Sequence, residues 1–238
     1  MDLNYGLLSA LFPSGIPALI YFTLLFAVML IAYLLGSLNS AIIISRLVYK
    51  DDIKTKGSGN AGLTNMLRSF GGRAALLTLF GDLFKTALAI GLAGLLFGFM
   101  YAGGISFSEP CYLAGLFAVL GHIFPVFYKF KGGKGVLVTS AMALFLTPLC
   151  FLVLLVIFVI IVAISKYVSL GSVSVAFLYP VVLSGYLKMF GAPTPGLMMA
   201  VTALLAVIII VCHRKNLERI SNRTENKLSF KKKEKSDE

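Results

Sequence analysis

The chain has 238 residues, of which 58% are hydrophobic and only 13% are charged. Soluble domains carry roughly 25% charged residues, so this composition excludes an ordinary soluble protein. The apolar residues gather in runs of about 18 or more, which is long enough to cross a bilayer of roughly 30 Å. We therefore expect an all-α, polytopic integral membrane protein without a soluble domain.

The net charge of +11 raises the question of a nucleic-acid partner. The basic residues flank the apolar runs, which is the pattern that anionic lipid and the positive-inside rule produce. No nucleic-acid motif accompanies them, so we expect membrane lipid and no nucleic acid. The three cysteines lie far apart in apolar sequence without a CxxC pair, so we expect no metal site and no disulfide.

The apolar runs predict helices, in chain order, over residues 19–48, 73–99, 110–128, 149–165, 173–187 and 197–212, with a short apolar segment over 135–146. Residues 1–18 are predicted to be an extracytoplasmic extension, 19–215 the membrane domain and 216–238 a basic cytoplasmic tail. The small residues Gly36 to Ser40 within the first helix predict close helix packing.

Topology follows from the placement of basic residues. Of the 21 Lys and Arg residues, only Lys188 falls in the segments that lie outside if the N-terminus is outside. This asymmetry predicts seven crossings, with the N-terminus outside and the C-terminus in the cytoplasm. The segment 135–146 is short for a crossing, so it is expected to be tilted or re-entrant.

With this topology, four polar segments lie on the same cytoplasmic side, namely 57–68, 129–135, 166–172 and 213–216. One site built from all four explains their placement better than four unrelated loops. The first segment, GSGNAGLTN, is rich in glycine, which lets a backbone approach a ligand and point N–H groups at it. Ser58, Asn60, Thr64 and Asn65 add donors and Arg68 adds a permanent charge, which together predict a cradle for phosphate.

Other chemistries fit the sequence less well. The glycine pattern over 57–62 matches a dinucleotide fingerprint, but no strand precedes it. His213 and Glu218 have nearly the spacing of an acyl-CoA acyltransferase motif, which is common by chance. A Ser-His-Asp order, a carboxylate pair and a metal-ligand set are all lacking. The glycine amides, hydroxyls and basic residues of the four polar segments suit acyl transfer from an activated donor. That reaction needs positioning and charge neutralisation more than a strong base.

Asp82 and Lys85 are three residues apart within a predicted membrane helix, so they share one face. Charges in such a segment are costly and usually face the protein interior. We interpret them first as a structural ion pair, with Arg73 as another possible partner, and leave a functional role open.

Six blocks follow one another along residues 25–220: Gly36-Ser37, GSGNAGLTN with Arg68, GDLFK, GHIFPVFYKFKGGKG, KYVSLGS and HRKN. In this order they resemble the bacterial glycerol-3-phosphate acyltransferases that use acyl phosphate, the PlsY family. The resemblance implies seven membrane helices in the cell inner membrane, with the active site facing the cytoplasm. It also implies transfer of a fatty acyl group from acyl phosphate to the 1-hydroxyl of glycerol 3-phosphate.

The products would be lysophosphatidic acid and inorganic phosphate, the first step of phospholipid synthesis, with no cofactor and with an acyl-phosphate-producing enzyme upstream. The resemblance implies a substrate phosphate as proton acceptor, while His213 could be a base or a binder. By the same resemblance the acyl phosphate is held by Gly57, Ser58, Gly59, Asn60, Gly62, Thr64 and Asn65. Glycerol 3-phosphate and the reacting centre are held by Arg68, Lys134, Ser172, His213 and Asn216.

Two other classes remain as alternatives. A carrier or flippase for a phosphorylated metabolite would place polar residues near the membrane midplane, where this sequence offers only Asp82 and Lys85. A CDP-alcohol transferase would require a run of metal-binding aspartates, which the sequence lacks.

Overall fold

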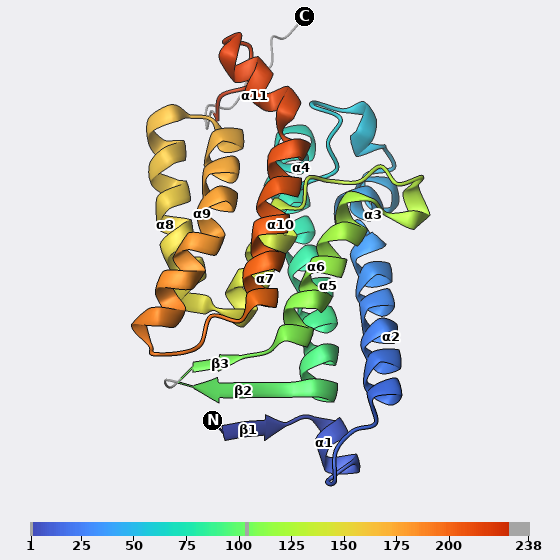
Figure 1. Cartoon of the computed structure of the whole chain (residues 1–238). Helices are drawn as coiled ribbons and strands as arrows, with labels where there is room; N and C mark the ends of the chain where they lie inside the picture. The colour runs from blue at the N-terminus through green and yellow to red at the C-terminus, as the bar shows by residue number, and fades with distance from the viewer. Residues whose placement is uncertain (1, 103–104, 229–238) are drawn as a thin grey trace, which may run out of the picture.

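The computed structural model describes residues 2–102 and 105–228. Its helices pack as a bundle that has a small sheet at one end and loops with short helices at the other (Figure 1). The long helices are α2 (Ala18–Ser37), α5 (Gly72–Phe97), α6 (Glu109–Ile123), α8 (Pro148–Ser165), α9 (Val168–Met189) and α10 (Gly196–Cys212). The shorter ones are α1 (Leu7–Leu11), α3 (Ser40–Leu47), α4 (Leu63–Phe70), α7 (Val136–Leu146), α11 (Arg214–Ser221) and the 3₁₀ turns η1 (Ile53–Thr55) and η2 (Val126–Tyr128).

Helices α2 and α6 approach closely because each presents a glycine to the other. A Cβ atom on Gly36 would lie 2.1 Å from the carbonyl oxygen of Ala118, and one on Gly121 would lie 2.1 Å from that of Tyr33. Both distances are far below van der Waals contact, so the two backbones touch only because these side chains are missing. The close packing predicted for the small residues near Gly36 is therefore confirmed.

The predicted continuous helix over 19–48 is wrong in one respect, because it breaks between α2 and α3. The side-chain oxygen of Asn39 accepts a hydrogen bond from the N–H of Ile42 (3.1 Å) and so caps a new helix. The ammonium of Lys85 binds the carbonyl oxygens of Gly36 (3.1 Å) and Leu38 (3.2 Å) at the end of α2. These partners satisfy backbone groups that a continuous helix would have paired internally.

A three-stranded antiparallel sheet lies outside the bundle, so the all-α prediction holds for the bundle only. Its strands are β1 (Asp2–Tyr5), β2 (Gly98–Ala102) and β3 (Ile105–Phe107), in the order β1-β2-β3. Backbone pairing places Asp2 opposite Tyr101 and Met100 opposite Phe107. Gly98 has φ +70°, which ends α5 and turns the chain into β2.

In the described part of the chain, five helical segments are long and apolar enough to cross a membrane, and a sixth is added if α10 and α11 count as one bent span. The 11-residue α7 is apolar but short. Seven crossings and the orientation of the termini therefore remain predictions. The lysine-rich end of the predicted tail, 229–238, lies outside the described residues.

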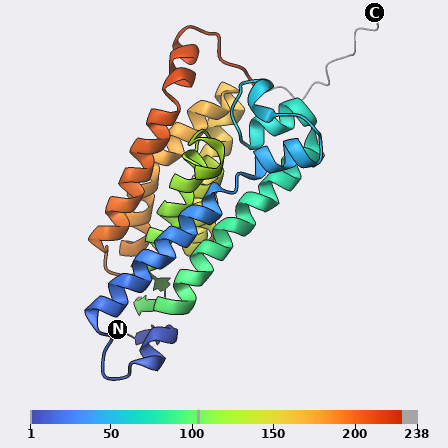
Figure 2. The ribbon, with the colours of Figure 1, turned by 90° about the vertical axis from the view of Figure 1, so that its right-hand side faces the viewer.

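Two helix boundaries matter for the site. Helix α9 begins at Val168, five residues before its predicted start, so Ser169 and Ser172 lie in its first turns. Helix α11 was not predicted, and it leaves α10 at an angle of 54° with His213 at the break. A view from the side shows α4 and the loop before it at the end of the bundle opposite the N-terminus (Figure 2).

Candidate active site

A cavity of about 410 Å³ opens where the four polar segments meet. Figure 1 shows α4 and α11 together at this end of the bundle, although they are far apart in the sequence. Most of the expected site residues line the wall of the cavity: Ser58, Asn60, Gly62, Thr64, Asn65, Arg68, Lys134, Ser172, His213 and Asn216. Gly57 and Gly59 do not line the wall. They shape the loop instead, because their φ angles of +54° and +71° favour glycine.

Asn65 holds the glycine-rich loop in place. Its side-chain NH₂ lies within hydrogen-bonding distance of the carbonyl oxygens of Lys56 (3.0 Å), Asn60 (3.0 Å) and Ile53 (3.3 Å). Its side-chain oxygen accepts from the N–H of Ser58 (3.0 Å). The polar atoms of Asn65 are therefore engaged by the loop itself, and the Ser58 hydroxyl remains the more exposed donor.

The loop ends at the beginning of α4, which adds an electropositive backbone to the wall. Gly62 caps α4, and Gly62, Leu63 and Thr64 all line the cavity. The first amides of a helix lack internal partners and favour an anion. Arg68 follows one turn later with an exposed guanidinium, so this side of the cavity can attract phosphate.

A series of hydrogen bonds along the cavity wall links Lys134 to Glu225. The ammonium of Lys134 donates to the side-chain oxygen of Asn216, whose NH₂ donates to Ser169 (3.0 Å) and to Glu225 (2.6 Å). Ser169 also donates to Glu225, and Arg219 forms an ion pair with it at 2.7 Å. Sequence reasoning missed Glu225 and considered Glu218 instead, which is exposed on α11 and outside the wall.

Two members of this hydrogen-bonded series, Lys134 and Glu225, have shifted pKa values. Burial lowers the pKa of Lys134, and the nearby Glu225 carboxylate offsets this only in part. Burial alone would raise the pKa of Glu225, but hydrogen bonds from Ser169, Asn216 and Arg219 outweigh it and hold that pKa below its usual value. Lys134 therefore loses its charge at a lower pH than an exposed lysine does.

His213 is oriented by its own helix. Its Nδ1 lies 2.7 Å from the carbonyl oxygen of Ile209, and because a carbonyl can only accept, Nδ1 carries the proton. In the neutral ring Nε2 is then an acceptor, which suits contact with a substrate hydroxyl. Ser172 is also buried and lines the same cavity, and it donates its own hydroxyl hydrogen to the carbonyl of Val168 (2.9 Å).

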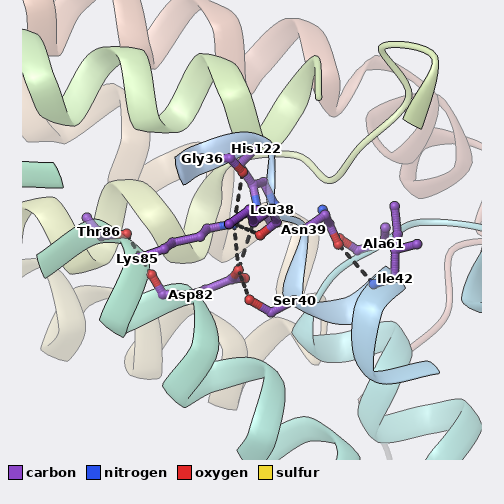
Figure 3. A network of polar contacts seen from close by, with 10 residues as sticks. All are labelled: Gly36, Leu38, Asn39, Ser40, Ile42, Ala61, Asp82, Lys85, Thr86 and His122. Carbon is purple, nitrogen blue, oxygen red and sulfur yellow. Dashed lines mark hydrogen bonds and ion pairs between the residues drawn. The ribbon is translucent and has the colours of Figure 1, made fainter. Parts of the chain in front are cut away.

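Asp82, Lys85 and His122 form a buried ionic cluster (Figure 3). Lys85 is 2.8 Å from the carboxylate of Asp82 and 3.1 Å from Nδ1 of His122, and Ser40 donates to the same carboxylate oxygen at 2.9 Å. The prediction that Asp82 and Lys85 pair with each other is confirmed. Asp82 and His122 also reach the cavity wall, a position that the sequence did not reveal for His122.

The wall of the cavity also has a largely apolar part along α8 and α9. This part includes Phe151, Leu154 and Phe158 from α8, with Val175 and Ala176 from α9. The cavity therefore offers a basic, hydrogen-bonding end and a hydrocarbon end, which is the shape that an amphiphilic anion requires.

The bundle and its apolar helices define an integral membrane protein with a basic, hydrogen-bonding cavity at one end. The family model of glycerol-3-phosphate acyltransferases matches residues 26–223. A glycerol-3-phosphate acyltransferase of Geobacillus kaustophilus is 41% identical over 205 residues, covering 85% of this chain and 95% of that protein. One from Bacillus subtilis is 37% identical over 201 residues, covering 84% and 96%.

Two solved structures are similar to this chain over most of its length. The crystal structure of PlsY, an integral membrane glycerol 3-phosphate acyltransferase, in its glycerol 3-phosphate form matches with a TM-score of 0.75 and 29% identity, over 86% of this chain and 96% of that one. A second PlsY structure, the lysophosphatidic acid form, matches with a TM-score of 0.72. The chain belongs to the glycerol-3-phosphate acyltransferase family, and the resemblance to PlsY is confirmed.

Proposed function

We propose that this protein transfers a fatty acyl group from acyl phosphate to the 1-hydroxyl of glycerol 3-phosphate, giving lysophosphatidic acid and inorganic phosphate. The observation that carries this proposal is the single cavity that joins a basic polar end to an apolar arm. The polar end suits a phosphate, and the arm suits an acyl chain. The glycerol 3-phosphate and lysophosphatidic acid forms of the PlsY structures support the same pairing of ligands.

The proposed roles divide between the two sides of the cavity. Ser58 and the amides around Gly62 hold the acyl phosphate, with Gly57, Gly59, Asn60, Thr64 and Asn65 shaping or lining that side. Arg68, Lys134, Ser172, His213 and Asn216 hold glycerol 3-phosphate and the reacting centre. The two cations offset the repulsion between two bound phosphates.

In the proposed reaction the 1-hydroxyl oxygen forms a bond to the carbonyl carbon of the acyl phosphate. The bond between that carbon and the phosphate oxygen breaks, and phosphate leaves with the electron pair. The hydroxyl proton passes to a phosphate oxygen of a substrate, so no side-chain base is consumed. Such a reaction relies on position and charge neutralisation, which the cavity supplies.

Acyl phosphate is the proposed donor because it is a mixed anhydride whose leaving group is already good. Among the described wall residues, no Ser-His-Asp arrangement is available to form an acyl-enzyme, and Glu218 is too exposed to serve His213 as an acyl-CoA motif would need. The motifs that resemble the PlsY family support the same donor. An enzyme that produces acyl phosphate would act upstream.

We further propose that the protein spans the bacterial inner membrane seven times, with the cavity facing the cytoplasm. The distribution of basic residues supports this orientation, because the loops around the cavity carry Lys54, Lys129, Lys131 and Lys134. Counting α7 as a short crossing would bring the spans to seven and leave the two ends of the chain on opposite sides.

The experiment that tests this function compares two donors. Detergent-purified protein is incubated with glycerol 3-phosphate and either palmitoyl phosphate or palmitoyl-CoA, and both phosphate and lysophosphatidic acid are quantified. We expect equal amounts of the two products with palmitoyl phosphate and neither with the thioester. Turnover with palmitoyl-CoA would overturn the donor assignment. Binding of glycerol 3-phosphate without turnover of either donor would favour a carrier.

A further inference from the structure

His122 is a buried cavity residue to which the proposed reaction assigns no role. It lies in the last turn of α6, is only 3% exposed and reaches the cavity wall. The loop that carries Lys134 folds back over it, because the N–H of Gly133 donates to the carbonyl of His122 (3.1 Å) and that of Gly132 to the carbonyl of Ile123 (3.0 Å). These hydrogen bonds fix the backbone of His122 against the loop.

The surroundings of Lys85 fix the tautomer of this ring. The ammonium of Lys85 has only acceptors around it, namely Asp82 at 2.8 Å and the carbonyl oxygens of Gly36 and Leu38 at 3.1 and 3.2 Å. Nδ1 of His122 lies 3.1 Å from the same ammonium, which can only donate. A proton on Nδ1 would meet the ammonium hydrogens, so the ring is neutral with its proton on Nε2.

The Nε2–H group lies where the two glycine loops meet. A Cβ atom on Gly133 would be 2.2 Å from Nε2 and 2.7 Å from the carbonyl oxygen of Ala61, so the two loops can pack around the ring only because Gly133 has no side chain. Within residues 2–102 and 105–228, Nε2 has no protein hydrogen-bond partner. Nε2 is also not among the fully buried polar atoms of these residues that lack a partner, so this N–H faces the cavity that His122 lines and can serve as a donor for a ligand.

We propose that His122, held as an Nε2–H donor by Lys85 and Asp82, donates a hydrogen bond to the carbonyl oxygen of the acyl phosphate as that oxygen gains negative charge. The inference rests on the proposed function, which assigns acyl phosphate to the loop containing Ala61 and glycerol 3-phosphate to the loop containing Lys134. The reacting carbonyl falls between those loops. A donor with a fixed orientation stabilises such an oxyanion without reorganisation. Lys85 and Asp82 are then positioning residues.

Two substitutions of similar size separate this role from a structural one. In His122→Asn the side-chain oxygen can still accept from Lys85, but the N–H facing the cavity is lost. In His122→Gln the longer amide can place an N–H near the former Nε2, while the fixed acceptor for Lys85 is lost. We expect kcat to fall about 10²-fold or more in His122→Asn, as for removal of one oxyanion donor, with an unchanged KM for glycerol 3-phosphate. His122→Gln should retain at least about tenfold more activity than His122→Asn.

A purely structural histidine predicts the opposite order, with His122→Asn the milder change, and that order would overturn the proposal. Wild-type kcat in both variants would overturn it as well. Glu218→Gln serves as a control, because this exposed side chain lies outside the cavity and should leave kcat unchanged. If the wild-type protein does not turn over palmitoyl phosphate, the proposed function fails independently of His122.

A second measurement uses the wild-type protein, so it does not depend on the folding of a variant. In protein with ¹⁵N-labelled histidine, the His122 resonances should report the neutral Nε2–H tautomer, and addition of palmitoyl phosphonate should shift the Nε2–H proton downfield. A proton on Nδ1, or an Nε2–H resonance that the phosphonate does not change, would contradict the proposal.

Discussion

Lys134 combines a charge with partial burial, and this combination sets its chemistry. Its ammonium donates to Asn216 and lies in the same hydrogen-bonded chain as Glu225. The sequence identified Lys134 and Asn216 because both stand in polar segments between apolar runs. It missed Glu225 and assigned His122 no place in the site, because their partners include residues that are distant in the sequence, namely Ser169 for Glu225 and Lys85 for His122. Residue type can indicate a donor, but only the fold shows what it faces.

Loss of the Lys134 charge should reduce turnover strongly. We expect Lys134→Ala to lower kcat/KM about 10²-fold or more, because a preorganised charge near the phosphates is lost. Lys131→Ala removes an exposed lysine from the same loop and should stay near wild type. Steady-state kinetics with palmitoyl phosphate would reveal both effects, and near-normal kinetics in Lys134→Ala would contradict its assigned role.

The lowered pKa of Lys134 predicts a pH dependence. The lysine binds an anion only while protonated, so affinity for glycerol 3-phosphate is present below this pKa and is lost as pH rises through it. KM for glycerol 3-phosphate should therefore rise at a lower pH than the titration of an exposed lysine would give. In Lys134→Arg this rise should move to higher pH, because a guanidinium stays charged. Identical pH profiles in the two proteins would rule out Lys134 as the titrating group.

Among the elements, the bounds of a helix could be predicted where hydrophobicity determines them. They could not be predicted where a single polar contact begins or ends the helix. The long apolar runs correctly predicted α5, α8 and α10 to within a few residues. The break between α2 and α3 depends on Asn39 and on Lys85 from another helix, so no local pattern reveals it. Asn39 also holds the first polar segment against the break between α2 and α3, because its side-chain NH₂ donates to the carbonyl of Ala61 (3.4 Å).

The close contact between α2 and α6 should not tolerate a methyl group. Gly121→Ala would place Cβ 2.1 Å from the carbonyl oxygen of Tyr33, so we expect a loss of about 1–3 kcal/mol in the free energy of unfolding. Gly91→Ala in α5 is the matched control, because nothing lies within 4 Å of its Cβ and alanine favours a helix. Thermal unfolding in detergent should show a lower Tm for Gly121→Ala only. Equal Tm values would contradict this, because they would show that α2 and α6 can move apart without a loss of stability.

The buried pair of Asp82 and Lys85 should respond differently to single and double substitution. Lys85→Met leaves a fully buried carboxylate without its counter-ion, which should cost about 3–5 kcal/mol of stability. Asp82→Asn combined with Lys85→Met removes both charges and should recover part of that loss. Chemical unfolding of the three proteins tests this, and a double variant less stable than Lys85→Met would contradict the ion-pair account.

At the scale of the whole molecule, composition alone predicted a helical membrane bundle, and the placement of basic residues predicted that four polar segments share one side. The structure brings all four segments to a single cavity. The small sheet was not predictable in the same way, because β1 and β2 lie more than 90 residues apart in the sequence and pair through backbone groups. Membership of the family rests on the ordered motifs and on the relatives, while the orientation in the membrane remains a prediction.

We propose that this cavity holds glycerol 3-phosphate for acyl transfer. A crystal structure of the protein soaked with glycerol 3-phosphate tests it most directly. We predict that the phosphate will lie within hydrogen-bonding distance of Lys134 Nζ, with the hydroxyl end turned into the cavity toward Ser58. Glycerol 3-phosphate bound elsewhere, such as between helices near the middle of the bundle, would contradict the account and favour a carrier.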